Sequence, residues 1–202
     1  MAVSKKFSAE RIEEAYRAGL REFGENYVQE FAEKYPLVKN LKGTRFHLIG
    51  HLQSNKVRQA SELFQVIQTA DSAKLLKRLD AAAGERGMVE QVLLEVKLSG
   101  EANKTGAEPE QLAELMKAAG ECSTIRVNGL MTMPPWSKDA EQSRPYFRRL
   151  AELGRRYGLG QLSMGMSNDF EVAIEEGATL IRVGTALFGS RPKPQNVASP
   201  VA

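Results

Sequence analysis

Apolar positions along the chain follow two alternating spacings, one typical of buried strands and the other of amphipathic helices. Leu75, Leu76, Leu79 and Ala83 recur at helical spacing, whereas short continuous apolar runs indicate strands. These runs predict strands at residues 2–4, 20–23, 45–49, 64–68, 91–98, 125–131, 162–166 and 179–183.

Helical patterns fill the segments between these strands. Pro36 and Gly177 are expected to end two of the helices, and Asp71 or Ser72 is expected to cap another. Helices are predicted at residues 9–18 and 27–36, after Lys56, after Asp71 or Ser72, and at residues 109–119, 140–157 and 170–176. Strict alternation of strand and helix predicts parallel strands joined by right-handed crossovers.

Eight such strands favour an α/β fold, a single (β/α)8 TIM-type barrel, over a doubly wound open sheet. Residues 1–190 are interpreted as one domain, followed by a polar tail at residues 191–202. Because no helix is predicted after the eighth strand, the outer helix ring is expected to be incomplete. The groove between the eighth and first strands would then be uncovered.

Composition excludes several classes of protein. The net charge of +3 comes from 28 basic and 25 acidic residues that are interspersed, which argues against a nucleic-acid surface. No apolar run is long enough to span a membrane, and nothing resembles a signal peptide. The single cysteine, Cys122, allows no internal disulfide and fits a reducing compartment, so a cytoplasmic location is expected.

Two consecutive strands end in small or hydroxyl residues. Ser167 and Asn168 follow the strand at 162–166, and Gly184 and Thr185 follow the strand at 179–183. In a (β/α)8 barrel, the loops after strands seven and eight commonly bind phosphate. The sequence therefore predicts a phosphate site here; the alternative is that these are ordinary helix-cap and turn residues.

Lys5 and Arg182 are the candidate reactive side chains. Lys5 directly follows the first strand, at the rim where barrel active sites lie, and a partly desolvated lysine amine can form a Schiff base with an aldehyde. Alternatively, Lys5 and Lys6 are both solvated. Strand alternation points Arg182 into the barrel, where it needs either a carboxylate such as Glu95 or Glu25 or a ligand heteroatom.

The other candidate side chains are not expected to bind a metal or to react with a ligand. His47 and His51 are separated by Gly50, which breaks the helix that a zinc-binding histidine pair would need. Cys122 is interpreted as an inert thiol, and Lys104 as a loop lysine on the same rim as Lys5.

Several motifs together resemble the pyridoxal phosphate homeostasis family, which is related to the barrel domain of alanine racemase. They occur in the family's order, from residue 1 to about residue 191. The motifs are Ala2-Val3-Ser4-Lys5, Phe23 to Glu30, the segment His47 to Lys56, Gly129 to Pro135, Arg144 to Phe147, Leu162 to Glu171, and Gly177-Ala178 together with Arg182 to Gly189.

The resemblance implies a site for pyridoxal 5′-phosphate (PLP). It makes Lys5 the Schiff-base lysine, directs Arg182 toward the pyridine nitrogen, and places Asn26 near the ring. It assigns the phosphate to Ser167 and to the turn at Gly184 and Thr185. Because a guanidinium cannot accept a proton, such a site leaves the ring a weak electron sink.

The function implied is PLP homeostasis, in which the protein buffers the cofactor or delivers it to apo-enzymes without turning over a substrate. The alternatives are a racemase or lyase of low activity and a regulatory module that senses cofactor occupancy. A monomer or weak homodimer is expected. The chain departs from the family in beginning within the first strand, without the usual preceding helix, and in carrying Lys6, a possible competitor for the aldehyde.

Overall fold

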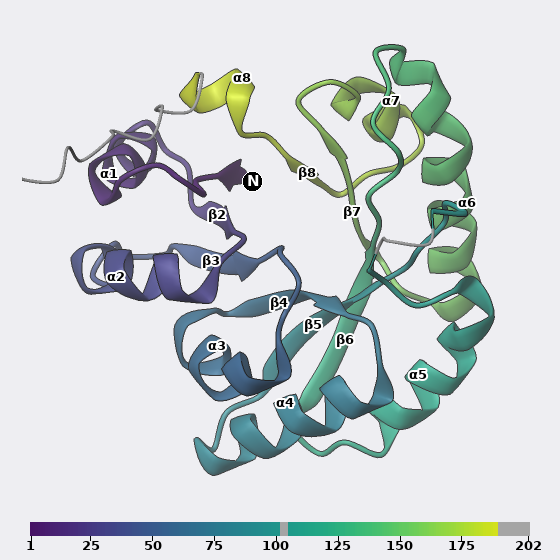
Figure 1. Cartoon of the computed structure of the whole chain (residues 1–202), viewed down its shortest axis with the longest axis horizontal. Coiled ribbons are helices and arrows are strands. Elements are labelled where there is room, and N and C mark those ends of the chain that lie inside the picture. Colours follow the sequence, from purple (N-terminus) through teal and green to yellow (C-terminus); the bar gives the residue numbers. More distant parts are fainter. Residues whose placement is uncertain (102–104, 190–202) are drawn as a thin grey trace, which may run out of the picture.

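The computed structural model describes residues 1–101 and 105–189, and within them eight parallel strands form one sheet whose order follows the sequence. The strands are β1 (Ala2–Val3), β2 (Glu22–Glu25), β3 (Arg45–Leu48), β4 (Val66–Ala70), β5 (Glu90–Glu95), β6 (Ile125–Met131), β7 (Gln161–Met166) and β8 (Leu180–Arg182). Figure 1 shows them side by side in this order.

The last strand returns to the first. The Val3 N–H donates to the Val183 carbonyl at 2.9 Å, and the Val183 N–H donates to the Met1 carbonyl at 3.0 Å. These bonds continue the parallel pairing beyond β8 and join it to β1. The prediction of a barrel rather than an open sheet is therefore confirmed.

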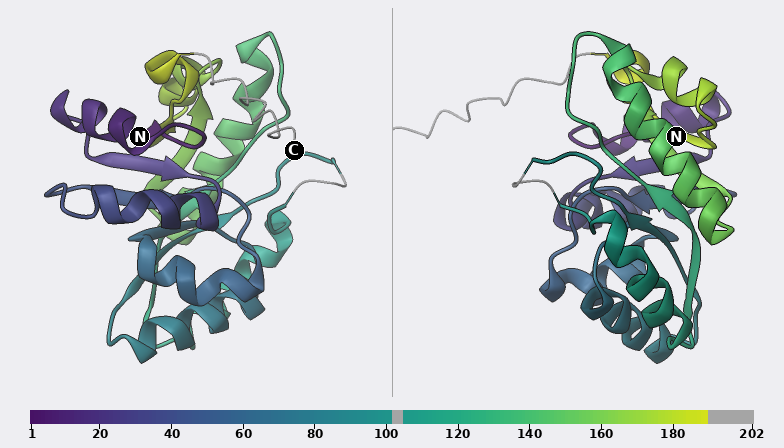
Figure 2. Two further views of the ribbon diagram at one scale, coloured as in Figure 1. Left: turned by 60° about the vertical axis from the view of Figure 1, so that its left-hand side comes forward. Right: turned by 90° about the vertical axis from the view of Figure 1, so that its right-hand side faces the viewer.

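Helices surround the sheet on its outer side (Figure 2). They are α1 (Ala9–Arg17), α2 (Val28–Val38), α3 (Val57–Leu63), α4 (Ala73–Glu85), α5 (Leu112–Gly120), α6 (Arg144–Tyr157), α7 (Phe170–Glu175) and α8 (Thr185–Phe188), with 3-10 turns at η1 (Ser54–Lys56), η2 (Pro109–Gln111) and η3 (Ala140–Ser143). Of the two predicted caps for α4, the structure uses Ser72, whose hydroxyl accepts from the Leu75 N–H.

The short helix α8 corrects one prediction. The sequence pattern predicts no helix after the eighth strand, whereas the structure forms a single turn there. Its buried Phe188 packs against Phe7, with ring centroids 5.0 Å apart, and Arg11 of α1 donates to the Phe188 carbonyl. Apolar side chains therefore cover part of the junction between β8 and β1.

Helix α2 also extends further than predicted, because Pro36 lies inside it instead of ending it. Proline removes one backbone hydrogen bond from a helix. The two additional residues bury Val38 completely, and the Lys39 N–H still bonds to the Tyr35 carbonyl at 2.8 Å. Burial of an apolar side chain outweighs the missing bond at this end of the helix.

Alternation along β3 shows how the core is divided. Phe46 faces outward and packs against Phe31 of α2, whose ring also contacts Phe64 at 4.8 Å between centroids. The next residue, His47, points to the opposite face and meets Gln68 of β4 inside the barrel. The main apolar core thus lies between the strands and the helices, whereas the barrel interior also holds polar side chains.

Candidate functional site

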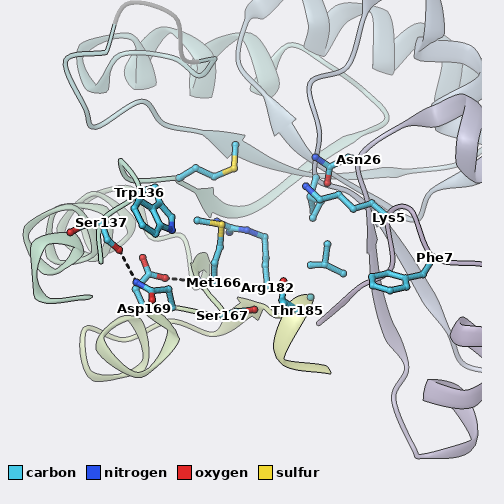
Figure 3. Close-up of a pocket in the computed structure, with 15 residues that line it drawn as sticks. Lys5, Phe7, Asn26, Trp136, Ser137, Met166, Ser167, Asp169, Arg182 and Thr185 are labelled. Atoms are coloured by element: carbon cyan, nitrogen blue, oxygen red, sulfur yellow. Dashed lines mark hydrogen bonds between the residues drawn. The ribbon is translucent and has the colours of Figure 1, made fainter. Parts of the chain in front are cut away.

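A cavity of about 300 Å³ lies at the carboxyl ends of the strands. All six predicted site residues line it, and they come from four different strand-exit regions. They are Lys5, Asn26, Ser167, Arg182, Gly184 and Thr185. Figure 3 shows Lys5 and Asn26 on one side of the cavity and Ser167 and Thr185 on another. The structure therefore brings these residues together, and their roles toward a ligand stay predictions.

Lys5 belongs to a tight turn after β1. The Phe7 N–H donates to the Ser4 carbonyl at 3.1 Å, which places Lys5 and Lys6 at the two central positions. Lys5 is partly buried and lines the cavity, whereas Lys6 is exposed and is not among the described residues that line it. The geometry therefore favours Lys5 over its neighbour as the amine that meets a ligand.

Arg182 points into the barrel, as predicted, but the carboxylate partners considered for it bond elsewhere. Its guanidinium donates to the Ser163 hydroxyl and to the Thr132 carbonyl, both at 2.8 Å. Glu95 instead accepts from the Thr105 hydroxyl at 3.0 Å, and Glu25 accepts from Ser4 and Lys34. The carboxylate interpretation is wrong, since neutral oxygens hold the guanidinium.

The electrostatics of the site follow from burial. Burial lowers the pKa of Arg182 to about 10, although the negative charges of Asp169 and Glu95 oppose this effect. Burial also raises the pKa of Glu95 to about 7, and the hydroxyl of Thr105 opposes that shift. A ligand atom that accepts a hydrogen bond from Arg182 would meet a cation held in a largely water-free environment.

A chain of buried polar groups extends from Arg182 across the barrel. Ser163 donates to the Gln68 side-chain oxygen at 2.7 Å, and the Gln68 amide nitrogen lies 2.8 Å from His47 Nδ1. Nε2 of His47 contacts the Glu22 carboxylate. Because an arginine can only donate and an ionised carboxylate can only accept, these bonds all run in one direction.

This direction fixes the histidine tautomer. Gln68 presents its oxygen to Ser163 and therefore its N–H to Nδ1 of His47, so the ring proton is on Nε2. Burial lowers the pKa of His47, which agrees with a neutral ring. Sequence reasoning missed this chain; the available signal was polar residues such as Gln68 and Ser163 within otherwise apolar strands.

No side chain of the loop after β7 caps α7, although helix capping was the alternative interpretation of Ser167 and Asn168. Asp169 stands at the cap position of α7, but its side chain accepts from the Met166 N–H at 2.7 Å and from the Ser143 hydroxyl at 2.8 Å. Asn168 donates to the Ser137 carbonyl at 2.8 Å. These bonds fix the Ser167 loop against the neighbouring strand-exit loop instead of capping the helix.

The apolar rim of the cavity was not predicted from the sequence. Met133 and Trp136, from the loop after β6, line it, and Trp136 is 72% exposed. The only tryptophan of the chain follows a Pro-Pro pair, which was the one available signal.

Lys104, the predicted loop lysine on the rim, lies outside the described residues. Within residues 1–101 and 105–189, no cluster of three or more His, Cys, Asp or Glu side chains is arranged to hold a metal ion. In the same part of the chain, none of the helices combines the length and apolar character needed to cross a membrane.

The fold and the position of the cavity define an alanine racemase type of barrel. The sequence matches the family described as alanine racemase, N-terminal domain, over residues 1–192. Alanine racemase of Clostridium difficile shares this fold with a TM-score of 0.76 at 12% identity, over 96% of this chain and 52% of that one.

Proteins with higher sequence identity identify the family more specifically. A protein of Aquifex aeolicus named pyridoxal phosphate homeostasis protein is 46% identical over 197 residues, which cover 95% of this chain and 86% of the relative. PipY of Synechococcus elongatus, solved with PLP bound, has a TM-score of 0.86 and 41% identity over 94% of this chain and 91% of that one. The chain therefore belongs to the pyridoxal phosphate homeostasis protein family.

Proposed function

We propose that this protein binds PLP as a Schiff base on Lys5 and holds it for supply to apo-enzymes, without turning over a substrate. The observation that carries the proposal is that Lys5, Arg182 and the two predicted phosphate loops line one cavity. Its volume of about 300 Å³ lies at the lower end of the range for small-molecule sites. The PLP-bound structure of PipY supports the choice of cofactor.

The polar groups of the cavity fit this cofactor. Asn26 Oδ1 is buried without a hydrogen-bond partner in the described structure, and an unmet acceptor of this kind suits a ligand hydroxyl. Arg182 offers donors to the pyridine nitrogen, and backbone N–H groups near Ser167 and Gly184 suit a phosphate. When bound, PLP would supply a reactive aldehyde and an electron-withdrawing ring.

A holding function, rather than catalysis, is supported by the titratable groups that line the cavity. Among the described lining residues these are Lys5, Asp169 and Arg182. Both carboxylate oxygens of Asp169 already accept hydrogen bonds, and Arg182 can only donate. Proton transfer at a substrate carbon needs a positioned acid or base besides the Schiff-base lysine. Arg182 cannot accept a proton, and the carboxylate of Asp169 is oriented toward the Met166 N–H and the Ser143 hydroxyl.

The proposal also covers the cellular location and the oligomeric state of the protein. A single cysteine suits a reducing compartment, so we place the protein in the cytoplasm. We also propose that it is a monomer or a weak homodimer. Burial raises the pKa of the Cys122 thiol, whose sulfur donates to the Ala118 carbonyl at 3.3 Å, and both effects keep the thiol unreactive.

Borohydride reduction after PLP addition tests the cofactor site. The wild-type protein and the Lys6→Met variant should show a visible Schiff-base absorbance and, after reduction and peptide mapping, an adduct on Lys5. The matched Lys5→Met variant should show neither. An adduct confined to another lysine, or no adduct in the wild type, would overturn the proposal.

Two further assays separate holding from catalysis. PLP-loaded protein mixed with an apo-enzyme and a phosphatase that destroys free PLP should restore the enzyme's activity better than free PLP does; equal recovery would contradict delivery. Incubation with amino acids in deuterated water should leave the α-protons in place. Deuterium incorporation that depends on Lys5 would favour the racemase or lyase alternative.

A further inference from the structure

Lys34 is a buried lysine that the proposed site does not use. It lies on α2 with 8% exposure, and its ammonium contacts four oxygens at 2.7 to 3.2 Å. Two of them belong to the carboxylates of Glu25 and Glu30, and two are the main-chain carbonyls of Ser4 and Phe7. A buried ammonium needs such partners, because an unpaired buried charge is costly.

The two carbonyls are those that enclose Lys5 and Lys6. Ser4 and Phe7 are the first and last residues of the turn after β1, so a single ammonium joins both of its ends. The carboxylates bond to the same turn: Glu25 accepts from the Ser4 hydroxyl, and Glu30 accepts from the Lys6 N–H. Lys34 and these two carboxylates are called here the Lys34 clamp. Together they form hydrogen bonds with Ser4, Lys6 and Phe7 and so hold the turn in place.

The conformation that the clamp holds is one that a lysine does not readily adopt. Lys6 has φ of +64°, and it is the only non-glycine residue with positive φ among the described residues. Such a conformation persists where surrounding contacts impose it. Without those contacts the turn would relax, and the directions of the Lys5 and Lys6 side chains would change together.

We propose that Lys34 is a positioning residue that selects Lys5, rather than Lys6, as the amine presented to the cavity. This inference rests on the proposed function, in which Lys5 is the lysine that reacts with PLP. Lys34 itself stays unreactive because its ammonium is occupied by the four oxygens of the clamp. The selection is geometric: two adjacent amines differ in access to one cavity, and the clamp determines which one enters it.

The test compares Lys34→Met with Lys77→Met, a matched control on the exposed face of α4. The readout is the ratio of borohydride-fixed PLP adduct on Lys5 to that on Lys6 after brief exposure. In the wild type and the Lys77→Met variant, the ratio should favour Lys5 by about tenfold or more, since small misplacements of reacting groups have effects of this size. In Lys34→Met it should fall to near equality, and Lys34→Arg should restore part of it.

A merely structural role would lower thermal stability without changing the ratio in the folded protein, so each ratio is measured where circular dichroism shows full folding. An unchanged ratio in folded Lys34→Met overturns the inference. If that variant does not fold, Glu30→Ala decides the question. It removes the acceptor shared by Lys34 and the Lys6 N–H from a side chain that is 27% exposed.

Glu30→Ala should lower the ratio in the same direction, and an unchanged ratio there would also overturn the inference. Failure of the proposed function gives a different result. In that case the wild type itself would carry no preferential adduct on Lys5.

Discussion

The guanidinium of Arg182 donates a 2.8 Å hydrogen bond to the hydroxyl of Ser163, and both side chains are buried. The Ser163 hydroxyl in turn donates a hydrogen bond to the Gln68 side-chain oxygen, and the chain of bonds continues through His47 to Glu22. The arginine of the cavity is therefore oriented by groups on β7, β4, β3 and β2. The charge of Arg182 has no direct carboxylate partner, and three neutral side chains connect it by hydrogen bonds to the Glu22 carboxylate.

Replacement of Ser163 with alanine should destabilise the protein. The change leaves a guanidinium N–H and the Gln68 oxygen without their partner inside the barrel. We expect a loss of about 1–3 kcal/mol in the free energy of unfolding, measured by denaturant titration. Exposed Ser123→Ala is the control, with a change within about 0.5 kcal/mol. A Ser163→Ala variant as stable as this control would show that the chain of bonds contributes little.

Glu90 should make stability depend on pH. Burial raises its pKa from 4.5 to about 7, an effect that the Ser61 hydroxyl and Arg86 oppose. The folded protein thus retains a proton that the unfolded chain releases. The stability from this group is complete below about pH 4.5 and is lost as the pH rises through about 7.

The Glu90→Gln variant carries a neutral side chain at every pH and isolates this effect. Its advantage over the wild type should grow from near zero at about pH 4 toward about 3 kcal/mol at about pH 8. Denaturant titrations at several pH values measure the difference, and exposed Glu110→Gln serves as the control. An advantage that does not change with pH would contradict the raised pKa.

The fold could be predicted from the sequence because it depends on local periodicity. Strand and helix spacing fixes the alternation, and alternation fixes parallel pairing. The predicted cavity residues followed from the same logic, since the barrel gathers every strand exit at one rim. Lys5, Ser167 and Thr185 needed only their places in chain order to be brought near one another.

The contacts that sequence reasoning missed depend on side chains meeting across the fold. In the sequence, Lys34 is one of several lysines in predicted helices. Only the structure shows that its ammonium donates to the carbonyls of Ser4 and Phe7. Asp169 stands at a helix start, yet its carboxylate turns toward Ser143, 26 residues away. Proline commonly ends a helix, but α2 continues past Pro36 because its last residue, Val38, is buried in the core.

Glycine at position 6 should stabilise the protein. Lys6 adopts φ of +64°, which costs most residues roughly 1–2 kcal/mol and costs glycine little. Glycine also makes the unfolded chain more flexible, so the net gain for Lys6→Gly should be about 0.5–1 kcal/mol. Lys6→Ala keeps the strain and provides the control for loss of the side chain. Equal unfolding free energies for the two variants would contradict the strain.

Gly50 should be required for the geometry of the cavity. A Cβ at this position would lie 2.2 Å from the Asn26 carbonyl oxygen and 2.8 Å from its Cα. The obstacle is main chain, which side-chain rotation cannot relieve, so Gly50→Ala must push β3 away from the segment that carries Asn26. We expect a loss of about 1–3 kcal/mol in stability from this overpacking.

The same displacement should weaken PLP binding, because Asn26 lines the cavity. We expect about a tenfold rise in the dissociation constant, equivalent to about 1.4 kcal/mol, from absorbance titration under conditions where the variant is fully folded. Gly160→Ala is the matched control, since its Cβ would meet nothing within 4 Å. If Gly50→Ala lost stability but bound PLP like this control, the position of the Asn26 backbone would not matter for the cofactor, and Asn26 would be a framework residue rather than part of the binding site.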